Sequence, residues 1–405
     1  MNFVFQTMTT SPSSQQNRCL YCGNNQTNHP MDKLTGLFNG MTASFNEYVL
    51  YSYPGRKLMH VIEKGLVLLS WIWFPLHIAK WSDDISKTKI ARGKVLWEEA
   101  EKRGIAMEQL MVFGRATDIY RVYLGDKWRH FTSLPRPDSI EVPAAAWIDD
   151  KAVLKKKLSS AGVQVSKGGG FFFFWSARRM FRKLEKPVVV KPRFGSRGRH
   201  TTTFVSTEEE FRRAFKVTKT LCPFVIVEEH LVGPVFRATA IDGEVRGLLA
   251  GEPPRIIGDG VHSILELIRE KDARKTGEVK DVPVHALLDG YLKRRGFSRD
   301  SVLPKGKEID LTEKIGVSYG GKSIEVMDIA HPKFIPALNK VARFINDPIL
   351  GFDFIAEDIT KDPDTQKWGI IECNAVPFIN LHHDPLEGKP SNVASAVWDM
   401  YLKRM

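Results

Sequence analysis

From Trp147 to the end of the chain, short apolar runs alternate with amphipathic stretches of helical spacing. The runs at residues 188–191, 224–228 and 370–372 are rich in β-branched and apolar side chains, which is typical of buried strands. Residues 151–161 have apolar and charged side chains at helical spacing, and the glycine that follows them often ends helices. This alternation predicts a catalytic region of the α+β or α/β class.

The chain before Trp147 has a different composition. Residues 1–30 are rich in Ser, Thr, Gln and Asn, and they lack the basic start and apolar core of a secretory signal. We expect a mobile tail there. Residues 94–104 have the pattern of a helix that ends at a glycine, and residues 111–135 alternate around a Gly-Asp turn signal, which predicts a hairpin.

Residues 61–78 form the most hydrophobic segment of the chain. The uninterrupted apolar part is shorter than the ~20 residues that a membrane-spanning helix needs. Its tryptophans and flanking basic residues would also suit a helix on a membrane surface, with contact over residues 61–81. We favour a buried or partner-covered helix over that alternative.

Composition and charge narrow the class of protein. The chain has 405 residues, 43% hydrophobic and 26% charged, which excludes a disordered or fibrous protein and suggests two or three domains. The formal net charge of +12 indicates an acidic partner, which could be nucleic acid, an anionic membrane, or a polyphosphate or carboxylate substrate. The densest basic run, residues 155–157, falls in a predicted helix and is interpreted as a solvated face.

The four cysteines exclude a disulfide scaffold and fit a reducing cytosol. Cys19 and Cys22 form a single CxxC pair, which is half of a zinc site, while Cys222 and Cys373 lie far away in the sequence. We therefore expect incidental thiols and not a zinc site.

A candidate phosphate loop follows the predicted strand that ends in Lys191. The loop at residues 194–200 contains Gly195, Ser196 and Gly198, and a second predicted strand returns from it. Glycines in such a loop let backbone N–H groups approach phosphate oxygens closely. The segment is not a P-loop, because no Gly-Lys-Ser/Thr follows and the loop joins two strands. An ordinary basic hairpin loop would have a similar sequence.

Two further segments place carboxylates at the ends of apolar strands. Glu228 and Glu229 end one such run and are either solvated strand-end residues or part of a nucleotide-binding hinge. Glu372 and Asn374 are two positions apart on a predicted strand, so their side chains share a face. With Asp353 from a neighbouring strand they would make the all-oxygen site that Mg²⁺ prefers, and burial of an unpaired Glu372 would be costly.

Taken in order, these segments resemble the ATP-grasp superfamily, and most closely the ATP-grasp domain of the cyanophycin synthetase family. The resemblance covers residues 148–405 and rests on VVVKP, GSRGR, VIVEEHLVG, GDGVHSILELI, SYGGKSIEV, GFDF, IIECNA and LHHDPLEGKPSNVA. It implies an ATP-grasp fold of the α+β class, in which two α/β subdomains hold ATP between them. It also implies an ATP-dependent carboxylate–amine ligase that works through an acyl phosphate.

The resemblance also implies roles for individual residues. Lys151 and Lys191, with the loop of Gly195, Ser196 and Gly198, would contact ATP phosphates, and Glu228, Glu229 and Leu231 would form the adenine and ribose hinge. Asp353, Glu372 and Asn374 would bind one or two Mg²⁺ ions, with Mn²⁺ as an alternative. Arg237, Ser318, Gly320, Gly321 and His382 would form the catalytic and substrate-carboxylate site.

Several positions depart from the family pattern. Val235 stands where an acidic residue is usual, and Gly251 stands where an arginine is common. The substrate loop has Tyr319 in place of threonine, and the phosphate loop has Arg197 in place of histidine and His200 in place of glycine. Most of these changes surround the acceptor site, so they put the substrate in doubt more than the ATP site.

The expected organisation is a mobile polar tail (1–45), an amino-terminal region with a hydrophobic helix, a helix and a hairpin (46–145), and two ATP-grasp subdomains (146–230 and 231–405). We expect a cytoplasmic homo-oligomer that acts on amino acids or small peptides and does not bind nucleic acid. A ligase that modifies a peptide or protein, and a nucleotide-binding protein without turnover, are the alternatives.

Overall fold

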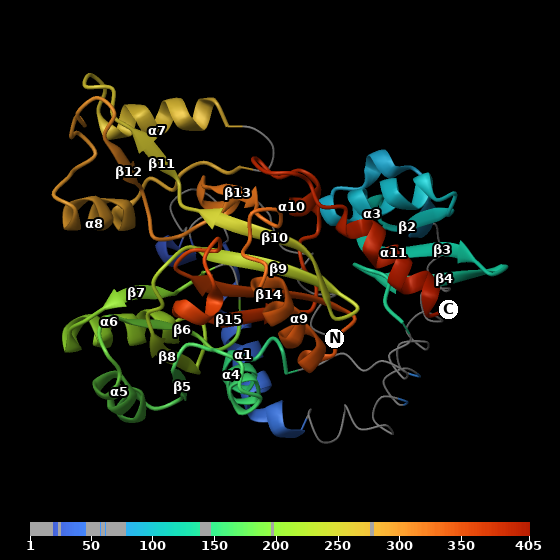
Figure 1. Cartoon of the computed structure of the whole chain (residues 1–405), viewed down its shortest axis with the longest axis horizontal. Coiled ribbons are helices and arrows are strands. Elements are labelled where there is room, and N and C mark those ends of the chain that lie inside the picture. The colour runs from blue at the N-terminus through green and yellow to red at the C-terminus, as the bar shows by residue number, and fades with distance from the viewer. Residues whose placement is uncertain are drawn as a thin grey trace.

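The computed structural model describes residues 19–22, 26–45, 57, 61, 78–137, 147–195, 198–275 and 279–405. The strands of these residues form four sheets, and helices cover them to give a mixed α/β architecture, as the sequence predicts (Figure 1). Most of the hydrophobic segment at residues 61–78 lies outside the described residues. Among the helices that the structure describes, none is both long enough and apolar enough to span a bilayer.

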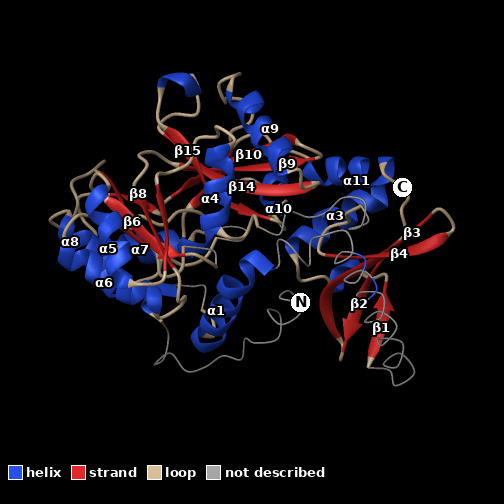
Figure 2. Ribbon diagram, turned by 90° about the horizontal axis from the view of Figure 1, so that it is seen from below, coloured by secondary structure: helices blue, strands red, loops and turns tan. Residues whose placement is uncertain are grey.

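The amino-terminal region contains a four-stranded antiparallel sheet that stands apart from the other sheets in Figure 2. Its strands are β1 (Ala79–Ser82), β2 (Met107–Val112), β3 (Arg115–Leu124) and β4 (Lys127–Thr132). The predicted helix is α3 (Ala91–Lys102), and the predicted hairpin is β3 and β4, joined at Gly125 and Asp126, which both have positive φ. Helix α3 packs against the last helix, α11 (Val393–Lys403), around Trp97 and Trp398.

Helix α1 (His29–Phe45) lies within the segment that the sequence predicts as a tail. It comes close to the segment before strand β8 (Val225–Glu229) at two glycines. A Cβ on Gly36 would lie 3.3 Å from the Cys222 sulfur, and a Cβ on Gly40 would overlap the ring of Phe224. The close approach of the helix therefore depends on these small residues.

The smaller of two sheets after Trp147 has the order β5-β8-β6-β7, with antiparallel neighbours throughout. Its strands are β5 (Gly168–Phe171), β6 (Val188–Pro192), β7 (Thr202–Val205) and β8 (Val225–Glu229). Helices α5 (Phe174–Lys183) and α6 (Glu208–Lys219) cover one face, where Phe181 and Phe211 stack at 4.6 Å between ring centroids. Strands β6 and β8 match the predicted apolar runs.

The larger of these two sheets has the order β13-β10-β9-β14-β15. Its strands are β9 (Val235–Ile241), β10 (Glu244–Glu252), β13 (Lys322–Glu325), β14 (Ile349–Ala356) and β15 (Trp368–Asn374). Helix α9 (Phe334–Ile345) packs on one face, and helix α4 (Lys151–Ser160) contacts β15. Phe334 of α9 is buried in one core with Phe236 and Phe354 of the sheet.

A separate small unit follows β10 and has its own core (Figure 1). It consists of strands β11 (Arg255–Ile257) and β12 (Glu308–Asp310) with helices α7 (Ile264–Ala273) and α8 (Ala286–Arg294). The short helical elements are η2 (Leu20–Cys22), η4 (Ile85–Lys87), η5 (Val317–Tyr319), η6 (Pro363–Thr365) and α10 (Asn380–His383). The domain boundaries that the sequence suggests stay predictions.

Candidate active site

The smaller and the larger sheet meet at a pair of lysines. Lys191, near the end of β6, donates from Nζ to the carbonyl oxygen of Ile371 on β15 at 3.4 Å. Lys151, the first residue of α4, donates to the carbonyl oxygen of Gly195 at 2.5 Å and lies 3.4 Å from a carboxylate oxygen of Glu372. Both side chains are buried. The structure therefore brings together the two lysines, the phosphate loop and one predicted metal ligand.

Glu228 is the counter-ion of this junction. Its carboxylate lies 2.6 Å from Nζ of Lys191 and 2.5 Å from Nζ of Lys155, and it accepts a 3.1 Å hydrogen bond from Ser166. Burial alone would raise the pKa of Glu228, but the two ammonium groups lower it to about 2. The carboxylate is therefore ionised at neutral pH.

Lys155 corrects one interpretation of the sequence. The sequence predicts a solvated helix face for the basic run at residues 155–157. Lys155, however, lies on the buried face of α4. It follows Lys151 by four residues, so both side chains lie on the same face of the helix. That spacing, with Leu154 and Leu158 beside it, is the signal that could have identified Lys155 as part of the site.

The predicted carboxylates lie opposite each other on neighbouring strands. Asp353 on β14 is the register partner of Glu372 on β15 and also of Arg237 on β9. The Arg237 guanidinium donates to both carboxylate oxygens of Asp353, at 2.7 and 2.8 Å. Burial raises the pKa of Asp353 against this ion pair, whereas Lys151, Lys191 and Arg237 outweigh burial at Glu372 and hold its pKa below the usual range.

The donor set fits a hard divalent cation. Asp353 and Glu372 offer carboxylate oxygens from adjacent strands, and Asn374 lies two residues beyond Glu372 on the same strand. Carboxylate and amide oxygens are the protein ligands that Mg²⁺ accepts, and the ion usually keeps several sites for phosphate and water.

The predicted nucleotide hinge follows β8. Glu229 makes two hydrogen bonds with Lys167. The Glu229 N–H donates to the Lys167 carbonyl at 2.8 Å, and the Glu229 carboxylate accepts from the Lys167 N–H at 2.8 Å. Leu231 is buried. A Cβ on Gly168 would lie 2.2 Å from the Val227 carbonyl oxygen, so β5 can approach the hinge only with glycine there.

The phosphate loop lies between α4 and the substrate loop. Gly195 accepts from Lys151, and a Cβ on Gly198 would lie 3.8 Å from the hydroxyl of Tyr319. Ser196 lies outside the described residues.

The predicted substrate loop is a 3-10 turn, η5, that contains Ser318. The N–H of Gly320 donates to the Val317 carbonyl at 3.3 Å, and the N–H of Gly321 donates to the Gly316 carbonyl at 3.1 Å. Gly320 has a φ of 82°, which other residues rarely adopt. Both glycine N–H groups therefore stabilise the turn itself.

His382 is completely buried beside Thr239 of β9. One ring nitrogen lies 2.8 Å from the Thr239 hydroxyl, and the other lies 2.7 Å from a carboxylate oxygen of Glu325. A Cβ on Gly247 would lie 2.3 Å from the imidazole ring. His382 contacts Thr239, which is two residues from Arg237 along β9. Both ring nitrogens of His382 are hydrogen-bonded to protein groups.

The sequence is similar to those of two named proteins. The chain is 30% identical over 311 residues to cyanophycin synthetase of Trichormus variabilis, a match of 75% of this chain and 34% of that protein. It is 26% identical over 316 residues to the glutathione biosynthesis bifunctional protein GshAB of Clostridium perfringens, covering 76% and 40%. The chain therefore spans between a third and a half of the length of these relatives. No protein-family model matches it.

Among solved structures, the bifunctional glutathione synthetase of Pasteurella multocida shares the fold, with a TM-score of 0.54 and 24% identity over 78% of this chain and 44% of that chain. The chain is therefore similar in sequence to part of cyanophycin synthetase, and it shares its fold with the bifunctional glutathione synthetase.

Proposed function

We propose that the protein is an ATP-dependent carboxylate–amine ligase that forms an amide bond through an acyl phosphate. The observation that carries this proposal is the cluster of four cations and three carboxylates, all buried or half-buried, where the two sheets meet. The cations are Lys151, Lys155, Lys191 and Arg237, and the carboxylates are Glu228, Asp353 and Glu372. Such a site suits phosphoryl transfer, in which catalysis depends mainly on positioning and charge stabilisation.

In the proposed reaction, a substrate carboxylate oxygen attacks the γ-phosphorus of ATP, and the bond to the β-phosphate oxygen breaks to release ADP. The amine of the second substrate then attacks the acyl carbon, and inorganic phosphate leaves. Lys151 and Lys191 would contact phosphate oxygens, and Arg237 would stabilise the charge that develops beside Asp353. Asp353, Glu372 and Asn374 would hold Mg²⁺, which neutralises phosphate charge when bound.

The finer parts of the proposal rest on the sequence and on the relatives. We propose amino acids or small peptides as substrates, one or two Mg²⁺ ions with Mn²⁺ as a substitute, a cytoplasmic location and a homo-oligomeric state. The named activities of the relatives, cyanophycin synthesis and glutathione biosynthesis, support amino acid chemistry.

ADP release by the purified protein with Mg·ATP tests the proposal, with pools of amino acids and dipeptides as substrates and mass spectrometry of every stimulated reaction. Lys191→Ala and Glu372→Ala should each slow ADP release on the order of a hundredfold, because each removes a charge that positions or neutralises phosphate. Lys94→Ala is the matched control, since Lys94 makes only an exposed 3.8 Å ion pair with Glu98 on α3.

Circular dichroism and melting curves show whether each variant is folded. Full ADP release by folded Lys191→Ala and Glu372→Ala proteins would refute the assignment of these residues. Nucleotide binding by the wild type with no stimulation from any pool would instead support the non-catalytic alternative.

A further inference from the structure

A group of sulfur and nitrogen atoms lies outside the site described above. Cys19, Cys22, His29 and His200 each direct one potential ligand atom toward a common centre, and these four atoms all lie within 4.8 Å of one another. The Cys19 sulfur is 3.3 Å and the Cys22 sulfur 3.5 Å from Nε2 of His200, while the Cys22 sulfur is 3.2 Å from Nε2 of His29. These separations are close to the edges of a tetrahedron with metal–sulfur bonds of about 2.3 Å and metal–nitrogen bonds of about 2.0 Å.

The interaction that orients His200 supports metal ligation. Its Nδ1 lies 2.8 Å from the backbone carbonyl oxygen of Val217 and 3.0 Å from the hydroxyl of Thr220. Because a carbonyl only accepts, Nδ1 carries the proton, and Nε2 presents its lone pair to the sulfurs. A ligating histidine typically donates its second nitrogen to a carbonyl or carboxylate in this way.

Hydrogen bonding among the four side chains explains this arrangement less well than a metal does. The sulfurs of Cys19 and Cys22 both lie against Nε2 of His200, whose one lone pair can accept a hydrogen bond from only one thiol. Cys22 and His200 are buried, and Cys19 and His29 are partly buried. A dication bound to two thiolates and two neutral imidazoles leaves no net charge, and this closes the site electrostatically.

We infer that Cys19, Cys22, His29 and His200 bind one structural zinc ion. This ion attaches the amino-terminal segment, which consists of η2 and helix α1, to the phosphate loop. Two sulfurs and two imidazoles with no open position are typical of a structural zinc site, whereas hard cations such as Mg²⁺ require oxygen ligands. The sequence alone indicated incidental thiols, because the CxxC pair supplies only half of a site. The other half comes from the start of α1 and from a loop 178 residues beyond Cys22.

The site connects three segments that are distant in the sequence. The His200 N–H donates to the Tyr21 carbonyl at 3.2 Å, and Nζ of Lys314 lies 3.4 Å from the same oxygen. Lys314 also lies 3.4 Å from the hydroxyl of Tyr319 in the substrate loop. The metal ligands therefore hold η2 against both the phosphate loop and the substrate loop.

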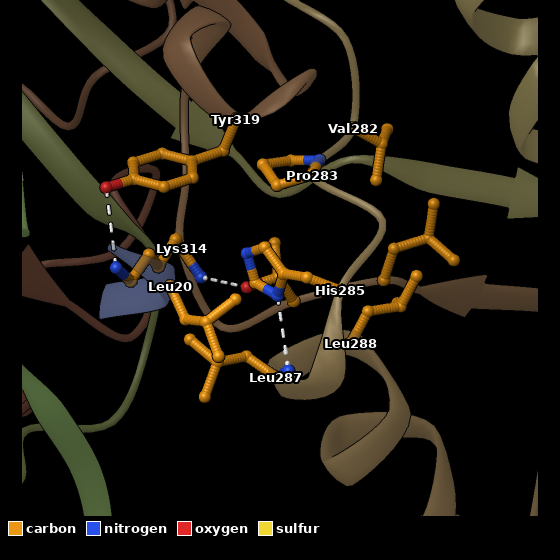
Figure 3. Close-up of a pocket in the computed structure, with 10 residues that line it drawn as sticks. Leu20, Val282, Pro283, His285, Leu287, Leu288, Lys314 and Tyr319 are labelled. Atoms are coloured by element: carbon orange, nitrogen blue, oxygen red, sulfur yellow. Dashed lines mark hydrogen bonds between the residues drawn. The ribbon is translucent and has the colours of Figure 1, made fainter. Parts of the chain in front are cut away.

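Two more contacts extend this attachment. Leu20 of η2 lines a small apolar pocket with Pro283, Leu287 and Leu288 next to Lys314 and Tyr319 (Figure 3). Asp32 of α1 lies 3.6 Å from the guanidinium of Arg199, which precedes the ligand His200. The proposed metal is thus the centre of a contact surface and not an isolated surface cluster.

Metal content tests the inference without reference to catalysis. Purified protein is reduced with a phosphine, its thiols are titrated, and it is incubated with one equivalent of Zn²⁺ and desalted before elemental analysis by mass spectrometry. We expect about one zinc per wild-type chain and loss of most of it in Cys22→Ser and His29→Ala. Cys222→Ser should retain the zinc, because its thiol is also buried but lies outside the cluster.

Cys19→Ser guards against misfolding of the other variants, since Cys19 is only partly buried and its replacement disturbs little packing. Replacement of zinc by Co²⁺ should give the intense visible absorption of a tetrahedral thiolate complex in the wild type and not in Cys19→Ser. Reduced wild-type protein that retains no zinc, or folded ligand variants that retain as much as the wild type, would overturn the proposal. Retention of a different metal would overturn the zinc assignment.

Hydrogen–deuterium exchange tests the attachment. Removal of the metal with a chelator should speed exchange in residues 26–30 and 198–205 several-fold and leave helix α11 unchanged. Unchanged exchange in the first two segments after proven metal loss would show that the ion does not hold them together.

Discussion

Replacement of Glu228 by glutamine tests the charge network where the two sheets meet. The Glu228 side chain is 3% exposed, and each of its oxygens accepts from a lysine, at 2.5 Å from Lys155 and 2.6 Å from Lys191. Glutamine preserves the size of the side chain but removes its charge. Two buried ammonium groups would then lack their shared counter-ion, and this arrangement is strongly unfavourable.

The size of the effect follows from the pKa of Glu228. Burial opposes ionisation, but Lys155 and Lys191 lower the pKa from the ordinary 4.5 to about 2. Because a tenfold change in proton affinity is worth about 1.4 kcal/mol, the charged side chain adds about 3 kcal/mol to the free energy of unfolding relative to its neutral form. Loss of one partner from a buried ion pair typically costs ~3–5 kcal/mol, which is the same range.

The pH dependence gives the prediction a sign. The folded pKa lies below the unfolded one, so the stabilisation is fully present above about pH 4.5 and is lost as the pH falls toward 2. Urea unfolding, followed by circular dichroism and tryptophan fluorescence, should show Glu228→Gln less stable than the wild type by a constant amount between pH 7 and about pH 5. Below about pH 4.5 the difference should shrink.

Glu208→Gln is the matched control. Glu208 also accepts from two basic side chains, Arg178 at 2.8 Å and Arg182 at 2.5 Å, but its side chain is 42% exposed. Solvent screens such pairs, so this variant should unfold at the wild-type urea midpoint. The reasoning is wrong if Glu228→Gln also unfolds at the wild-type midpoint at pH 7, or if its deficit persists undiminished as the solution is acidified.

Two further stability predictions concern other parts of the fold. Gly247→Ala should lower the free energy of unfolding by about 1–3 kcal/mol, because its Cβ would overlap the buried ring of His382. The control is Gly290→Ala in helix α8, which should be neutral or stabilising because its Cβ would have no neighbour closer than 3.9 Å. Urea midpoints of the two variants measure this, and equal midpoints would contradict it. Arg103→Ala should lower the free energy of unfolding by about 1–2 kcal/mol, because Arg103 donates to Ser395 and Asp399 of α11 at 2.6 and 2.7 Å. The control is Lys102→Ala, which replaces the exposed last residue of α3 and should not change the melting temperature. A similar melting temperature for both variants would mean that these contacts do not hold α3 to α11.

Local patterns predict several strands of the two sheets that meet at Lys151 and Lys191, among them β6, β8 and β15, and the carboxylates on them. The two-residue period of a strand puts Glu372 and Asn374 on one face, and pairing of adjacent strands then places Asp353 opposite Glu372. Each inference needs only a few consecutive residues and one sheet. Lys155 escaped prediction for the opposite reason, since its burial depends on Glu228, a residue 73 positions away on another element.

The orientation of the substrate loop also lies beyond a sequence pattern. Ser318, Gly320 and Gly321 suggest a turn whose N–H groups are free to bind a carboxylate. The structure uses the N–H groups of both glycines inside the turn, where positive φ at Gly320 closes it. A motif fixes which residues can form a turn, whereas the direction of each N–H depends on the torsion angles that the surrounding strands impose.

Three of the departures from the family pattern have a common location. His200, where glycine is usual, contacts both cysteines of the amino-terminal segment, and Tyr319, where threonine is usual, lies with its hydroxyl 3.4 Å from Lys314. Gly251, where arginine is common, leaves space for Ile315, which a Cβ at this position would approach to 2.5 Å. All three face the amino-terminal segment or residues 314–321, which contact that segment through Lys314. The same sequence keeps Lys151 beside Glu372 and Lys191 beside Glu228, so these departures coincide with the attachment of the amino-terminal segment while the charged cluster between the sheets is kept.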